Sequence, residues 1–158
     1  MSKKTSIIVV ALLVAAAVFL GLVLVNKGDG PVAGMIMSDK TAESVKDFEA
    51  VKISEDSGVY LILEKAYDKF VEKLINNIPA GRDLYANIYL VECPKGSIFN
   101  VKWVSEGKTV KEETKELATD KKGVVTYVLD GSNVKSGNYT LEIHTENKKI
   151  FEHNFLIH

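Results

Sequence analysis

The sequence predicts a mainly β protein, in which one N-terminal membrane-spanning helix is followed by an antiparallel β-sandwich. Two observations support this prediction. An unbroken apolar run occupies residues 7–25, and from Leu84 onward apolar and polar residues alternate in short segments that end in turn residues. Alternation with a period of two is typical of strands that bury one face, and short strands separated by turns at roughly ten-residue spacing are typical of sandwiches.

The apolar run has the length of a membrane span. Residues 7–25 carry no charge, and at about 1.5 Å per residue a helix of this length roughly matches the hydrocarbon core of a bilayer. Lys3 and Lys4 precede the run, so the positive-inside rule places residues 1–6 in the cytoplasm and the rest of the chain outside. A cleaved signal peptide is the alternative, but its apolar core is usually shorter and precedes a small-x-small site, for which residues 32–34 are a poor candidate. We therefore expect an uncleaved, single-pass signal anchor in the cell membrane.

A stalk and one extracytoplasmic domain are expected after the anchor. Residues 26–44 contain three glycines and one proline and show no sustained periodicity, which predicts a flexible stalk. Residues 45–158 then form one domain of ordinary size. The apolar residues 35–37 interrupt the stalk, and both contact with lipid headgroups and docking on the domain are open for them.

The first part of the domain has two interpretations. Apolar residues between 66 and 78 recur at helical spacings and are followed by Pro79, which predicts one short amphipathic helix. The alternative is a strand at 59–64 followed by an irregular crossing at 70–74. A strand at 59–63 is expected in any case, because these residues are apolar and mostly β-branched, aromatic or leucine.

Further strands are predicted from residue 84 to the end of the chain. Residues 84–91 are apolar on both parities, as expected for a central strand that is covered on both sides. Three later strands, at 99–103, 139–143 and 151–157, have apolar residues on one parity, which predicts one buried and one solvated face. Residues 124–129 are β-branched and aromatic and end at the turn pair Asp130 and Gly131, which predicts a further short strand.

The residues of these strands resemble a known family. The pattern consists of Trp103, then Gly107, Lys108 and Val110, then Gly137 and Tyr139, and finally Phe155 and Ile157. It resembles the Ig-like β-sandwich modules of membrane-anchored bacterial and archaeal surface proteins, over about residues 78–158. The resemblance implies an Ig-like fold and a role in adhesion, ligand presentation or protein contact without a cofactor. Leu141 stands where disulfide-bearing members have their second cysteine, so the chain departs from that subtype.

Charge and cysteine content exclude other classes. Lys3 and Lys4 are the only charged residues before Asn26, so the following chain has 18 basic and 21 acidic residues and a formal charge of −3. A surface of this kind lacks the basic stripe of nucleic-acid-binding proteins. Cys93 is the sole cysteine and cannot form an intramolecular disulfide. We expect it to be buried, and an exposed thiol beside the turn at 94–96 is the alternative.

Catalytic and metal-binding motifs are absent from the sequence. It contains no Gly-x-Ser-x-Gly motif, no phosphate-binding loop and no calcium loop, which predicts a protein that is not an enzyme and has no cofactor or metal. The alternative is a small metal-binding or enzymatic envelope protein that uses His144, His153 and a nearby carboxylate, Glu142 or Glu152. Pairing of the last two strands would be needed to bring these groups within bonding distance of a metal.

Tyr85 and Tyr89 are the candidate binding residues. They share a parity opposite to Ile88 and Leu90, so both can face away from the core. Exposed aromatic side chains are typical of contact surfaces, while half-buried core positions are the alternative for tyrosine. The sequence thus predicts a membrane-anchored extracytoplasmic module for binding or structural interaction, with an envelope protein or a wall polymer as its partner.

Overall fold

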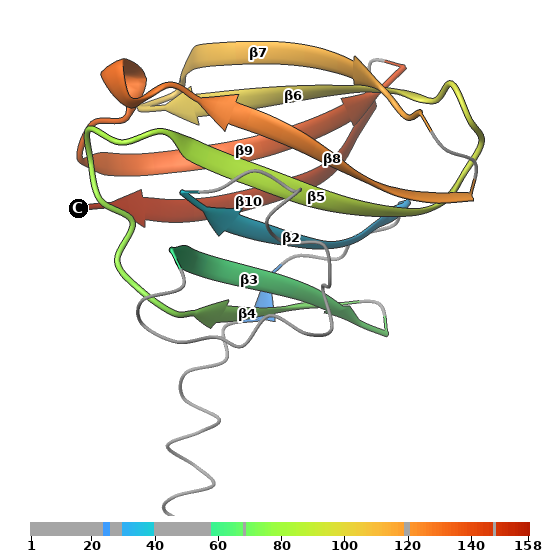
Figure 1. Ribbon diagram of the computed structural model, residues 1–158, viewed down its shortest axis with the longest axis horizontal. Helices are drawn as coiled ribbons and strands as arrows, with labels where there is room; N and C mark the ends of the chain where they lie inside the picture. The colour runs from blue at the N-terminus through green and yellow to red at the C-terminus, as the bar shows by residue number, and fades with distance from the viewer. Residues whose placement is uncertain (1–23, 26–29, 40–57, 68, 119–120, 147) are drawn as a thin grey trace, which may run out of the picture.

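The computed structural model describes residues 24–25, 30–39, 58–67, 69–118, 121–146 and 148–158. These residues form two antiparallel sheets with almost no helix (Figure 1), which confirms the predicted mainly β architecture. One sheet has six strands in the order β1-β4-β3-β2-β5-β8, and the other has four in the order β10-β9-β6-β7.

The strands of the six-stranded sheet are β1 (Leu24–Val25), β2 (Val32–Ser38), β3 (Val59–Ala66), β4 (Lys69–Leu74), β5 (Leu84–Cys93) and β8 (Lys121–Leu129). The strands of the four-stranded sheet are β6 (Ile98–Ser105), β7 (Lys108–Glu116), β9 (Gly137–Thr145) and β10 (Lys148–Ile157). A short 3₁₀ helix, Gly131–Asn133, lies in the connection between β8 and β9. Every strand predicted from residue 84 onward is confirmed, since residues 84–91 lie in β5 and the later predicted ranges lie in β6, β8, β9 and β10. Strand β7 is an addition to the predicted strands.

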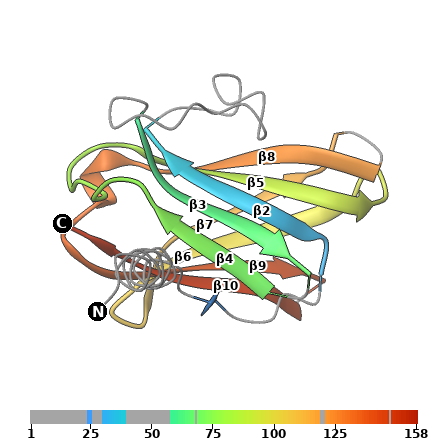
Figure 2. The ribbon, with the colours of Figure 1, turned by 90° about the horizontal axis from the view of Figure 1, so that it is seen from below.

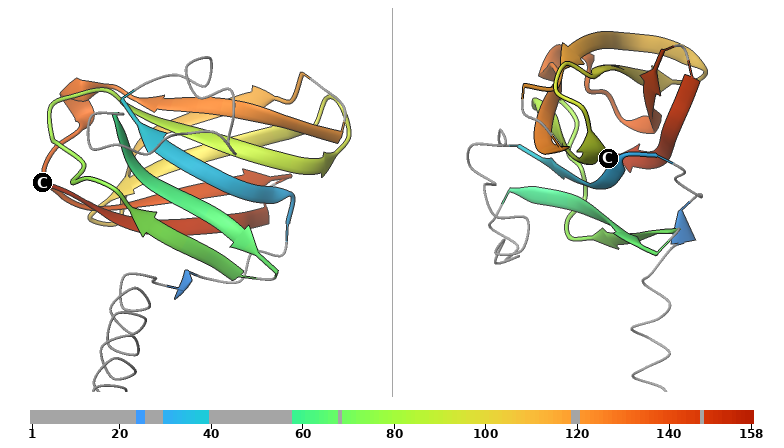
Figure 3. Two further views of the ribbon diagram at one scale, coloured as in Figure 1. Left: turned by 60° about the horizontal axis from the view of Figure 1, so that its bottom comes forward. Right: turned by 90° about the vertical axis from the view of Figure 1, so that its right-hand side faces the viewer.

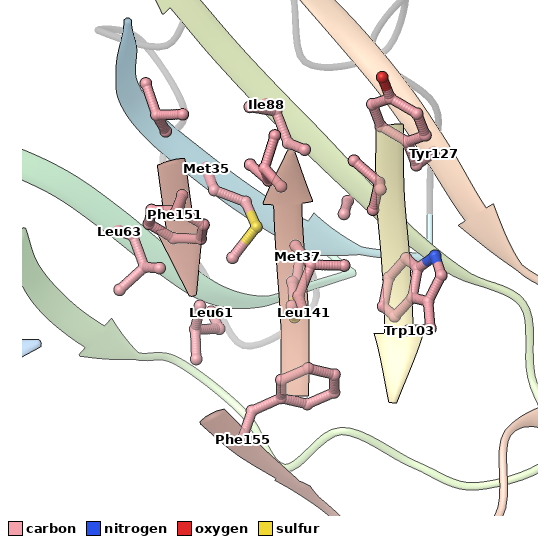
Figure 4. Packing of buried hydrophobic residues seen from close by; sticks show 14 of the residues in the cluster. Met35, Met37, Leu61, Leu63, Ile88, Trp103, Tyr127, Leu141, Phe151 and Phe155 are labelled. Atoms are coloured by element: carbon pink, nitrogen blue, oxygen red, sulfur yellow. The ribbon is translucent and has the colours of Figure 1, made fainter. Parts of the chain in front are cut away.

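The two sheets lie face to face and enclose the core. Figures 2 and 3 show them as two layers, and one hydrophobic cluster contains buried residues from both. Met35 and Met37 of β2 and Ile88 of β5 meet Trp103 of β6 and Leu141 of β9 in this layer (Figure 4), and each is at most 1 % exposed. Removal of these apolar surfaces from water is the main force that holds the two sheets together.

The helix predicted within residues 66–78 is wrong. Lys69–Leu74 is strand β4, which pairs antiparallel with β3. Phe70 is fully buried and packs edge-on against Phe151 of β10, with ring centroids 5.0 Å apart. Leu74 belongs to the apolar face of the predicted helix but is 57 % exposed. Pairing with β3 and contact with the opposite sheet therefore override a local pattern that also fits a helix. The strand expected at 59–63 is confirmed as part of β3.

The prediction of a flexible stalk is wrong for Val32–Ser38. These residues form β2, which lies between β3 and β5, and Met35 and Met37 are fully buried. The domain therefore includes residues well before position 45. A strand that is covered on both sides has no polar alternation, so this short apolar run, which contains Gly34 and follows Gly30 and Pro31, resembled a linker. Of the two alternatives for residues 35–37, docking on the domain is the one observed.

Most of the predicted anchor lies outside the described residues. The exceptions are Leu24 and Val25, which pair antiparallel with Val71 and Phe70 of β4 as strand β1. The predicted end of the helix is therefore wrong at these two positions. In the part of the chain that the structure describes, no helix is both long enough and apolar enough to cross a membrane.

The C-terminus ties the two sheets together at one end of the molecule. Ile157 at the end of β10 forms an isolated parallel bridge with Ile78, in the connection between β4 and β5. The backbone N–H of His158 donates to the carbonyl of Ile78 at 2.9 Å, and the N–H of Ala80 donates to the carbonyl of His158 at 2.9 Å. The segment that follows β4 is thereby held beside the end of β10.

The hydroxyl of Tyr139 holds the connection between β8 and β9 through two hydrogen bonds to its backbone. The hydroxyl donates to the carbonyl of Asn133 at 3.1 Å and accepts from the N–H of Lys135 at 3.0 Å. The ring is stacked on Phe155 with centroids 5.8 Å apart. Tyr139 therefore contacts both the β8–β9 connection, which crosses from one sheet to the other, and the hydrophobic core.

We expect Tyr139→Phe to lower the free energy of unfolding by about 1–2 kcal/mol, because the ring stays but the half-buried backbone groups of Asn133 and Lys135 lose a partner. Denaturant unfolding of the full chain in detergent measures this loss. Tyr85→Phe is the matched control, since it removes the hydroxyl of a half-buried tyrosine on the outer face of the other sheet. Equal effects of the two substitutions would contradict a specific role for the Tyr139 hydroxyl.

Candidate functional site

A hollow of about 680 Å³ lies where β4 of one sheet meets β10 of the other. The connection after β4, the turn between β6 and β7 and the start of β9 complete its walls. We call it the seam hollow and define it by Glu72, Leu74, Asn77, Asn138, Asn154 and Leu156. It lies at the end of the molecule where the C-terminus is seen in Figure 1.

Two leucines line the seam hollow with much of their surface in solvent. Leu74, at the end of β4, is 57 % exposed, and Leu156 of β10 is 47 % exposed. Leu156 is exposed because its neighbours Phe155 and Ile157 face the core, and the strand alternation turns it outward. Two large aliphatic side chains at one concave surface indicate a contact site more strongly than single exposed ones do.

The polar lining of the seam hollow is mainly neutral. Asn77, Asn138 and Asn154 contribute amides, and the Thr140 hydroxyl donates to the Asn154 side-chain oxygen at 2.7 Å. Glu72 is half-buried, and burial raises the pKa of its carboxyl above the ordinary value. Lysine and arginine are absent from the described lining residues. The hollow therefore combines apolar and amide groups with weakly acidic character.

His153 lies behind Glu72 in the core. Its Nε2 atom is 3.6 Å from Oε2 of Glu72, so the pair spans the two sheets. The imidazole is 1 % exposed, and burial lowers its pKa from 6.5 to about 4. Neither ring nitrogen has a hydrogen-bond partner within the described part of the chain. The ring is therefore neutral at physiological pH and stacks on Phe155, with centroids 6.3 Å apart.

The structure does not bring His144 and His153 together with a carboxylate, so the alternative metal site that uses them is not formed. His153 pairs with Leu141 and faces the core, whereas His144 alternates with Ile143 and faces outward. The Nε2 atom of His144 lies 2.8 Å from Oε2 of Glu142. The two histidines project from opposite faces of the four-stranded sheet because side chains alternate along strands. Among the described residues, no group of three or more His, Cys, Asp or Glu side chains could hold a metal ion.

Tyr85 and Tyr89 lie where their parity places them, on the outer face of β5, and both are half-buried. Between them, buried Asn87 donates to the hydroxyl of Ser38 at 3.3 Å and accepts from the hydroxyl of Thr126 at 2.8 Å. Neither tyrosine lines the seam hollow. Their role in binding stays a prediction.

Cys93 is 4 % exposed at the end of β5, which confirms the predicted burial. Its thiol donates to the carbonyl of Val91 at 3.3 Å, and burial raises its pKa. A turn follows at Lys95 and Gly96. Because the thiolate is the reactive form, this cysteine has the properties of a small core residue.

The residues of the seam hollow were not identified from the sequence. Leu156 offered a signal, since it is an apolar residue on the solvated parity of the last strand. Glu72 and Leu74 offered none, because the sequence left the segment around them open between a helix and an irregular crossing. The hollow exists only once the ends of β4 and β10 are brought together.

Comparisons with known proteins found no family model that matches the chain and no match among curated proteins. The site itself must therefore carry any functional inference.

Proposed function

We propose that the protein is a single-pass, membrane-anchored extracytoplasmic protein whose Ig-like β-sandwich serves as a binding module. The seam hollow is its contact surface. The observation that carries this proposal is the concave site in which Leu74 and Leu156 are exposed beside the half-buried carboxylate of Glu72. Concave surfaces with apolar walls and a few polar groups are the usual form of binding sites.

Strand order supports the Ig-like part of the proposal. In Ig-type sandwiches one sheet contains strands G, F and C side by side, and the other contains A, B and E. The order β10-β9-β6-β7 corresponds to G-F-C with one added strand, and β2-β5-β8 corresponds to A-B-E. The hairpin of β3 and β4, together with β1, extends the second sheet beyond β2 (Figure 2).

Two side chains support the same assignment. Trp103 lies on β6, in the place of strand C, is fully buried, and packs edge-on against Phe155. Tyr139, near the start of β9, bonds through its hydroxyl to the backbone six residues upstream, which is the pattern of the tyrosine corner of Ig-type domains.

The sequence supports the membrane location. The uncharged apolar residues 7–25 are preceded by Lys3 and Lys4, so the N-terminus is placed in the cytoplasm and the sandwich outside. The described lining of the seam hollow contains no lysine or arginine, which supports a partner other than nucleic acid.

Membrane extraction and flotation of the full chain test the anchor. We expect the chain to remain with membranes after alkaline extraction, and external protease to cleave the sandwich region in right-side-out vesicles. Ala15→Arg combined with Val18→Arg should release the chain, because each charge at the centre of a span costs about 3 kcal/mol. A freely soluble wild-type chain would contradict the proposal.

Site-specific photo-crosslinking tests the contact surface. A photoreactive residue at Leu156 should form adducts in native membranes. The same residue at Ile98 should form few, because that position is 57 % exposed at the start of β6 but lies outside the seam hollow. Equal adduct yields at the two positions would show that the hollow is not a preferred contact surface.

A further inference from the structure

We propose that the seam hollow docks on the lipid surface of the protein's own membrane, and that its partner is the zwitterionic headgroup region. This inference rests on the proposed function, because it requires residues 7–23 to be anchored in that membrane. It follows from the place where the apolar run joins the sheet, from the exposed apolar residues and from the charge of the hollow.

The apolar run joins the sheet beside the hollow. Leu24 and Val25, its last two residues, pair with Val71 and Phe70 of β4, so no tether separates the run from the domain. Figure 3 shows β1, drawn in blue, at the edge of the six-stranded sheet below β4. Because the pairing is antiparallel, the chain reaches Leu24 from the side on which Glu72 and Leu74 follow Val71. The anchor therefore enters the domain on the side of the seam hollow.

The length of the remaining run brings the domain close to the lipid. Residues 7–23 would span about 25 Å as a helix, slightly less than the hydrocarbon core of about 30 Å. A short span is accommodated when its flanking residues lie at the interface. Here the residues that flank the span are Leu24 and Val25 of β1. Because β1 pairs with β4, the hollow beside β4 is held at the level of the headgroups.

Exposed apolar side chains lie on this side of the domain. Leu74 at the end of β4 and Leu156 of β10 are 57 % and 47 % exposed. Leucine side chains suit the boundary between headgroups and acyl chains. One face of the domain thus offers the residue types that a bilayer surface accepts.

The polar groups of the hollow select a zwitterionic surface. Asn77, Asn138 and Asn154 supply amide donors and acceptors for headgroup phosphate and ester oxygens. Glu72 and Glu106 are the acidic residues of the described lining, which includes no lysine or arginine. Anionic lipid would be repelled rather than attracted, so docking does not depend on it.

Depth-dependent fluorescence quenching tests the inference. Single cysteines at Leu156 and Leu74, in the full chain with Cys93→Ala, carry an environment-sensitive dye in phosphatidylcholine vesicles that contain headgroup spin-labelled lipid. Ile98→Cys is the matched control, an exposed aliphatic position outside the hollow. We expect quenching at positions 156 and 74 to exceed that at 98 by about twofold or more, because interfacial contact lies within about 10 Å of the quencher.

The outcomes separate the inference from the proposed function. If the chain floats with the vesicles but quenching is equal at positions 156 and 98, docking of the hollow is wrong and the anchor stands. If the chain does not float, the proposed function fails. Replacing a fraction of the phosphatidylcholine with anionic lipid should not raise the ratio of quenching between positions 156 and 98. A large rise would contradict docking on a zwitterionic surface.

Discussion

Trp103→Ala is expected to lower the free energy of unfolding by about 4 kcal/mol, the usual loss for a large buried aromatic residue replaced by alanine. Trp103 is fully buried in the centre of the four-stranded sheet, and its ring contacts Phe155 edge-on with centroids 6.3 Å apart. Its removal leaves a cavity between two sheets whose backbones are fixed by strand pairing, so the site cannot collapse fully. The shift of the denaturation midpoint, at unchanged slope, measures this loss.

Two further variants show whether the loss comes from the packing of Trp103. Trp103→Phe should cost clearly less, because it fills part of the cavity and removes an indole N–H that has no hydrogen-bond partner in the described part of the chain. Ile98→Ala changes an exposed residue of the same strand and should cost less than about 1 kcal/mol. A loss for Trp103→Ala as small as that for Ile98→Ala would contradict the core assignment.

Stability is expected to fall by about 3 kcal/mol as the pH is lowered from 6.5 to about 4, because of His153. Burial lowers the pKa of this imidazole from 6.5 to about 4 in the folded chain, and each pH unit of difference is worth about 1.4 kcal/mol. Above pH 6.5 the imidazole is neutral in both states and the contribution is complete. Between the two values only the unfolded chain binds the proton, so folding is increasingly disfavoured.

Glu72 acts in the opposite direction. Its pKa is raised by burial, so the folded chain binds a proton more readily than the unfolded chain, and this contribution grows as the pH falls through the raised pKa. A protonated His153 would also face the Glu72 carboxylate at 3.6 Å. Both effects offset part of the loss, so about 3 kcal/mol is an upper value for the His153 contribution.

Denaturant unfolding at several pH values, with two histidine variants, measures this effect. His153→Leu should remove most of the pH dependence in this window, since it keeps an apolar side chain in the core and removes the titrating group. His144→Gln should retain the dependence, because His144 lies on the outer face of the same sheet. An unchanged acid loss in His153→Leu would show that other groups cause it.

The alternating strands and the long apolar strand β5 were predictable, but the short central strand β2 was not. Phe99, Val101 and Trp103 turn toward the core because every second side chain points to the same face, a rule that needs no partner to be known. Met35 and Met37 gave no such signal, because β2 lies in the middle of its sheet and Ile36 between them is also buried. A linker was therefore predicted where a central strand exists.

The candidate site could not be predicted from local sequence patterns, because its residues become neighbours only in the folded chain. Glu72, Leu74 and Leu156 come from strands of different sheets that are far apart in the sequence. A helix predicted at 66–78 would have placed Leu74 in the core. Only pairing of β4 with β3, together with the contact of Phe70 with Phe151, turns the end of β4 toward β10 and opens the hollow.

The sequence by itself determined the mainly β architecture, the outward parity of Tyr85 and Tyr89, and every strand from residue 84 onward except β7. It favoured the burial of Cys93, which the structure confirms. These properties depend on the alternation of side chains along one strand and on the preference of each residue type for water or for the core. The tertiary structure decided the place of β2, the strand at 69–74, the separation of His144 from His153 and the seam hollow. Each of these depends on which strands become neighbours, and that choice is set by burial shared between segments distant in the chain.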